Sequence, residues 1–139
     1  MADTKKIGIA LLATKTGVDL NGTAADETTL YTVPTGKSCL IFAYGFRDFS
    51  ANATSSAITC GKTGGSCDEF FGSSGTKITM SGFSGTTKGG FVMGLPAFTA
   101  AGTIHTILTA GQAAGVEITD AAGVACTCTI DVFGYTYDA

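Results

Sequence analysis

The side chains that could do chemistry in this sequence are few, and their spacing does not bring them together. His105 is the only histidine, and it stands in an apolar stretch beside Ile104. A lone histidine with no metal-ligand spacing around it is usually structural. Asp68 and Glu69 are adjacent, so on a strand they would point to opposite faces and could not work as a paired acid and base. We therefore predict no catalytic residue, no metal ion and no cofactor.

Two segments contain part of a phosphate-binding loop, namely Gly36-Lys37-Ser38 and Gly61-Lys62-Thr63. That motif requires a glycine five residues before the second glycine, but Tyr31 and Ser56 occupy those positions. It also requires a helix immediately afterwards, whose N-terminus binds the phosphate. An apolar strand-like run follows one segment and a glycine pair follows the other. Both are predicted to be turns, and we expect a protein that is not an enzyme.

The chain contains five cysteines, an odd number. Cys126 and Cys128 lie two residues apart on one predicted strand face, which is poor geometry for a disulfide. Cys60 and Cys67 flank a glycine-rich turn and could meet across a hairpin. We expect five small buried thiols in a reducing compartment, with a Cys60–Cys67 bridge formed after cell lysis as the main alternative.

Composition favours an all-β domain. The 139 residues suit one domain, and only 14% are charged, whereas about 25% is usual. The sequence contains 23 threonines and 20 glycines in place of the missing charged residues, and strong helix formers are sparse. We expect an N-terminal arm at 1–6 and a single domain at 7–139.

Charge and hydropathy limit the partners. The net charge is −3 and the lysines are scattered, which argues against a nucleic-acid partner. The apolar run at 7–13 is too short to span a membrane, and no small-residue cleavage site follows it. We therefore predict a first strand rather than a signal peptide, a protein made in the cytoplasm, and no membrane partner.

Alternation and turn spacing predict a single antiparallel β-sandwich of the jelly-roll type. The clearest strands are Lys37–Phe49 and Ala125–Tyr137. Their expected core faces are Leu40, Phe42, Tyr44 and Phe46 on the first, and Cys126, Cys128, Ile130 and Val132 on the second. Shorter candidates are Ile7–Ala13, Thr29–Val33, Ala57–Cys60, Glu69–Phe71, Lys77–Met80, Phe91–Leu95, Thr103–Leu108 and Gly115–Thr119.

The two ends of the domain resemble small virion proteins of tailed bacteriophages. The opening Thr29-Leu-Tyr-Thr-Val-Pro-Thr-Gly-Lys37 carries one part of the resemblance. The segments Leu108-Thr-Ala-Gly-Gln-Ala-Ala-Gly-Val116 and Ile130-Asp-Val-Phe-Gly-Tyr135 carry the other. It covers roughly 28–49 and 104–137 and implies a β-sandwich that decorates capsids or forms head or tail fibres. It supplies no catalytic or binding residue.

These observations lead us to expect a non-enzymatic virion protein, most specifically a capsid decoration (cement) protein on the outer surface of the major capsid shell. The alternative is a head- or tail-fibre adhesin that binds a host glycan through loop aromatics such as Phe70, Phe71 and Phe83. Core packing is the other interpretation of these three aromatics. A carbohydrate-binding module of a secreted enzyme would normally have a signal peptide and an exposed tryptophan, and the sequence contains no tryptophan.

Self-association is expected from the last strand. Phe133, Tyr135 and Tyr137 share one face, and three aromatic side chains there are costly to leave in water. We predict a homotrimer with these residues at the subunit interface and the major capsid protein as the other partner. The alternative is that they cover the sandwich's own edge. Lys5, Lys6 and Ile7 are the candidate capsid contact, with an ordinary frayed terminus as the alternative.

Overall fold

In a computed structural model, the chain is described at residues 8–65, 67–70, 77–85, 89–93 and 107–139, and every regular element there is a β-strand. The strands are β1 Ala10–Asp19, β2 Glu27–Thr32, β3 Lys37–Arg47, β4 Ala57–Lys62, β5 Ile78–Thr79, β6 Gly90–Met93, β7 Ile107–Thr109, β8 Ala113–Asp120 and β9 Thr127–Asp138. This part of the chain therefore holds no helix that is long and apolar enough to cross a membrane.

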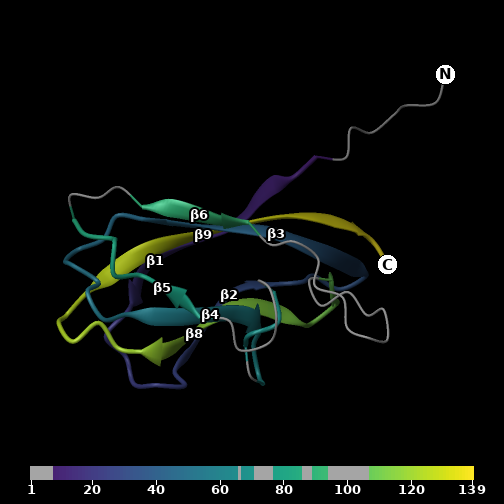
Figure 1. Ribbon diagram of the computed structural model, residues 1–139. Helices are drawn as coiled ribbons and strands as arrows, with labels where there is room; N and C mark the ends of the chain where they lie inside the picture. Colours follow the sequence, from purple (N-terminus) through teal and green to yellow (C-terminus); the bar gives the residue numbers. More distant parts are fainter. Residues whose placement is uncertain (1–7, 66, 71–76, 86–88, 94–106) are drawn as a thin grey trace.

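The strands form two antiparallel sheets, which Figure 1 shows as an upper and a lower layer. Sheet A has five strands in the order β1-β9-β3-β6, with β7 also paired to β3, and sheet B has four in the order β2-β8-β4-β5. The first four strands alternate between the sheets, whereas β4 and β5 are neighbours in sheet B and β6 and β7 both pair with β3 in sheet A. These two strand orders are those of a jelly roll. The predicted fold class is confirmed.

Most predicted strands are present with shifted ends. The exception is the segment Glu69–Phe71, because Glu69 and Phe70 are not in a strand and Phe71 lies outside the described residues. His105 and most of the predicted strand Thr103–Leu108 also lie outside them.

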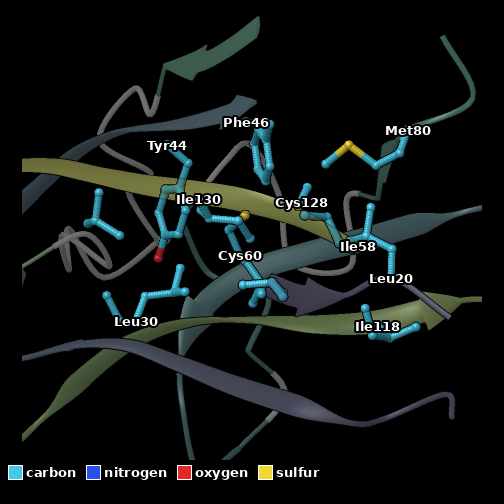
Figure 2. Packing of buried hydrophobic residues seen from close by; sticks show 14 of the residues in the cluster. Leu20, Leu30, Tyr44, Phe46, Ile58, Cys60, Met80, Ile118, Cys128 and Ile130 are labelled. Carbon is cyan, nitrogen blue, oxygen red and sulfur yellow. The ribbon is translucent and has the colours of Figure 1, made fainter. Parts of the chain in front are cut away.

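The hydrophobic core lies between the inner faces of the two sheets. Tyr44 and Ile130 of sheet A point toward Cys60 and Ile118 of sheet B in Figure 2. The Tyr44 phenol also donates a hydrogen bond across the core to the Gly115 carbonyl, at 3.1 Å. The β9 residues predicted for the core, Cys126 (just before the strand), Cys128, Ile130 and Val132, are all buried.

The predicted core face of β3 is only half right. Tyr44 and Phe46 are buried, but Leu40 and Phe42 are half-exposed, and Cys39 and Ile41 are buried instead. The cause is a β-bulge, because β9 pairs with Ile41 and then with Ala43, which leaves Phe42 as an extra residue. One extra residue reverses the alternation of side chains between the faces of a strand. The core face of β3 therefore changes from odd to even positions at the bulge.

Candidate subunit interface

The outer face of β9 brings together the three aromatic residues singled out from the sequence. Val132 and Ile130 point into the core, so Phe133, Tyr135 and Tyr137 point away from it. All three side chains are half-buried. The rings of Tyr135 and Tyr137 stack with centroids 5.5 Å apart.

Two leucines from neighbouring strands extend this surface. Leu11 of β1 is the register partner of Phe133, and Leu40 of β3 is the partner of Tyr135. Leu11 is 55% exposed, which is high for a large apolar side chain. We refer to Leu11, Leu40, Phe133, Tyr135 and Tyr137 as the aromatic patch. Neither leucine was predicted here, because strand register is not visible in the sequence.

Gly134 allows the strands beneath the aromatic patch to approach closely. A Cβ atom on Gly134 would lie 2.4 Å from the Leu40 carbonyl oxygen and 2.7 Å from Leu12 Cδ1. Only glycine fits between β1 and β3 at this point. The position of the patch therefore depends on a residue without a side chain.

Charged groups border the aromatic patch at both ends. At one end, Arg47 Nε donates to Asp131 Oδ2 at 2.8 Å, and the Thr14 hydroxyl donates to Asp131 Oδ1 at 2.6 Å. These hydrogen bonds, with that of Arg47 foremost, lower the pKa of Asp131 despite burial. At the other end, Lys37 pairs with Asp138. An apolar surface between ion pairs is suited to contact with another macromolecule.

The five cysteines offer little reactivity. All are buried and none is in a disulfide. Burial is the main cause that raises the pKa of Cys39 to about 11 and those of Cys67 and Cys128 to about 12. Thiols in such surroundings stay protonated near neutral pH.

The Cys60–Cys67 bridge is not present. Cys60 belongs to the core cluster on the inner face of sheet B. A Cβ on Gly61 would point to the outer face, and there it would lie 2.4 Å from the Cys67 carbonyl carbon. The backbone at Cys67 therefore crosses the opposite face of β4 from the Cys60 side chain.

The aromatic residues considered for glycan binding are used for packing where the structure describes them. Phe70 is fully buried, and its ring lies 6.4 Å from that of Tyr44. Phe83 is half-buried and stacks on Phe49 at 5.0 Å. Core packing, the other interpretation of these aromatics, is confirmed for Phe70, because its segment returns along β4, where the Phe70 amide donates to the Cys60 carbonyl. Phe71 and the arm residues Lys5, Lys6 and Ile7 lie outside the described residues.

Comparison with known proteins supports the fold. No family model matches the sequence, and no curated protein matches it. Among solved structures, the chain is similar to one described as "Cyanophage Pam1 capsid asymmetric unit", with a TM-score of 0.52 and 19% sequence identity. The match covers 97% of this chain and 89% of the other. At this identity the similarity shows a shared jelly-roll architecture.

Proposed function

We propose that this protein is a structural component of a tailed-phage virion, and specifically a decoration protein on the outer surface of the major capsid shell. The observation that carries the proposal is the similarity in fold, over almost the whole of both chains, to a chain from a cyanophage capsid. The resemblance of residues 28–49 and 104–137 to small phage virion proteins supports it from the sequence. A chain in which only 14% of the residues are charged suits broad contact with neighbouring subunits.

The proposed role is not enzymatic. The chemistry-bearing groups that the structure describes serve the fold: the thiols are buried, burial raises the pKa of four of them, and Glu69 accepts a hydrogen bond from the Lys62 amide at 2.8 Å. These observations support a protein that acts by binding other proteins.

The proposed assembly is a homotrimer that uses the aromatic patch as its subunit interface. Capsid surfaces offer local threefold and sixfold positions, where a symmetric protein binds through several copies at once. The arm at 1–6, with Ile7, would then contact the shell.

Co-sedimentation with capsids of the encoding phage tests this function. The full chain should pellet with capsids that lack it, and cryo-electron microscopy should place it on the outer shell surface. Deletion of residues 1–6 should weaken pelleting, because Lys5 and Lys6 of the arm are lost, while circular dichroism stays unchanged. Absence from capsids, together with clear hits on a glycan array, would contradict the proposal and favour a fibre adhesin.

A further inference from the structure

One cross-strand row on the outer face of sheet B concentrates negative charge. Glu27 of β2 is the register partner of Glu117 of β8, and Glu117 is the partner of Thr59 of β4. The next residues along these strands, Ile58 and Ile118, are buried in the core, so the row faces away from it. Two carboxylates directly opposite each other destabilise a sheet. This row is thus unfavourable in the protein alone.

Glu117 is the centre of this unfavourable arrangement. Its side chain is half-buried, and its pKa is raised first by burial and then by the negative charges of Glu27 and Asp68. Within the described ranges, no group donates a hydrogen bond to its carboxylate. Glu27 has one such donor, because one of its oxygens accepts from the Gly64 amide at 2.8 Å. The carboxylates of Glu27 and Glu117 therefore offer more hydrogen-bond acceptors than the described residues around them fill with donors.

Thr59 adds a second, independent deficit at the same place. The residue is 3% exposed, and its hydroxyl has no hydrogen-bond partner among the described residues. A buried hydroxyl without a partner costs about 1–3 kcal/mol, so native proteins rarely leave one. The loop brings Asp68 to this face, because a Cβ on Gly61 would lie 2.4 Å from the Asp68 amide nitrogen. We refer to Glu27, Thr59, Asp68 and Glu117 as the acidic row.

We propose that the acidic row binds an arginine side chain of a partner protein. A guanidinium carries several donors in a planar fork, which suits acceptors spread along a row. No group of three or more metal-ligating side chains in the described part of the chain is placed to hold an ion, which favours the organic cation. The assignment of this arginine to the capsid shell rests on the proposed function. The binding of a guanidinium by the acidic row is independent of the proposed function.

Titration of the full chain with argininamide, followed by ¹H–¹⁵N NMR, tests the site. Saturable shifts are expected at the amides of Glu27, Thr59 and Glu117. Glu117→Gln should weaken binding at least about tenfold, because it removes the central charge. This variant should remain folded, since it also removes a repulsion. Asp120→Asn is the matched control on the same strand, because Asp120 pairs with Lys77 at 3.0 Å, and it should bind as the unmodified protein does.

Three outcomes would overturn the inference. The first is the absence of saturable shifts at the acidic row. The second is equal binding by Glu117→Gln. The third is the same set of shifts with calcium chloride at lower concentration than with argininamide, which would make the site a metal site. None of these outcomes depends on capsids. Failure of the co-sedimentation experiment would therefore not contradict arginine binding, and failure of the argininamide titration would not contradict capsid binding.

Discussion

At the scale of single residues, two phenylalanines of β3 show that an apolar side chain does not always belong to the core. Phe42 and Phe46 have the same side chain on the same strand. Phe46 is 2% exposed and belongs to the core cluster, whereas Phe42 is half-exposed at the bulge and is not part of that cluster. Residue type is therefore a weaker guide to stability here than the position of a residue relative to the bulge.

Phe46→Ala should lower the free energy of unfolding by about 3–5 kcal/mol, because it removes a buried ring and leaves a cavity. Phe42→Ala, the matched control, should lower the free energy of unfolding clearly less, because the Phe42 ring is already partly exposed to solvent. Urea denaturation of both variants measures the difference. Equal losses would contradict the assignment of the core face.

Asp131→Asn should weaken the fold by about 1 kcal/mol at neutral pH, because the Asp131 carboxylate accepts from Arg47 and Thr14. The pKa of Asp131 is lowered in the folded state. Its contribution is therefore complete above the unfolded pKa of about 4 and is lost as pH falls through the lowered folded pKa.

The difference in stability between the unmodified protein and Asp131→Asn should accordingly shrink as the pH is lowered below about 4. Thermal unfolding across this range measures it. Asp120→Asn is the control, because the Asp120 side chain is 53% exposed and its pair with Lys77 is screened by water. A difference that stays constant with pH would refute the linkage.

At the scale of elements, close packing of β9 against its neighbours depends on glycine. The β9 strand pairs with both β1 and β3, and both pairings shift register near Gly134. The Leu40 carbonyl and the Leu12 side chain occupy the space where a Cβ would be. This arrangement holds the aromatic patch on one continuous surface.

Gly134→Ala should destabilise the protein by about 1–3 kcal/mol or more, because the added methyl group meets a backbone carbonyl that cannot move without disturbing the ladder. Gly65→Ala is the control, since a Cβ there meets nothing within 4 Å. Its effect should stay within about 0.5 kcal/mol. Chemical denaturation distinguishes the two, and a silent Gly134→Ala would count against the close approach.

At the scale of the whole molecule, the two sheets present opposite kinds of outer surface. Sheet A carries the aromatic patch between ion pairs, and sheet B carries the acidic row. An apolar surface favours contact with a copy of the same chain, whereas an acidic row favours a basic partner. This asymmetry agrees with the proposed assembly, in which one surface contacts the other subunits of the trimer and another surface contacts the capsid shell.

Light scattering should give three times the monomer mass of 14.0 kDa at micromolar concentration. Tyr135→Ser should shift the protein toward monomer, because it removes one half of the stacked tyrosine pair. Val124→Ser changes an apolar side chain that is 51% exposed outside the aromatic patch, and it should leave the mass unchanged. A monomer that Tyr135→Ser does not alter would defeat the trimer.

The all-β class and the buried cysteines followed from the sequence, because they depend on composition and on local alternation. The inward face of the last strand followed for the same reason, since Cys128, Ile130 and Val132 alternate without interruption. Tertiary structure alone decided three further features: the reversal at Phe42, the burial of Phe70 and the pairing of Glu27 with Glu117. Each results from the register between segments distant in the chain, and register is set by backbone pairing and packing, which no local sequence pattern specifies.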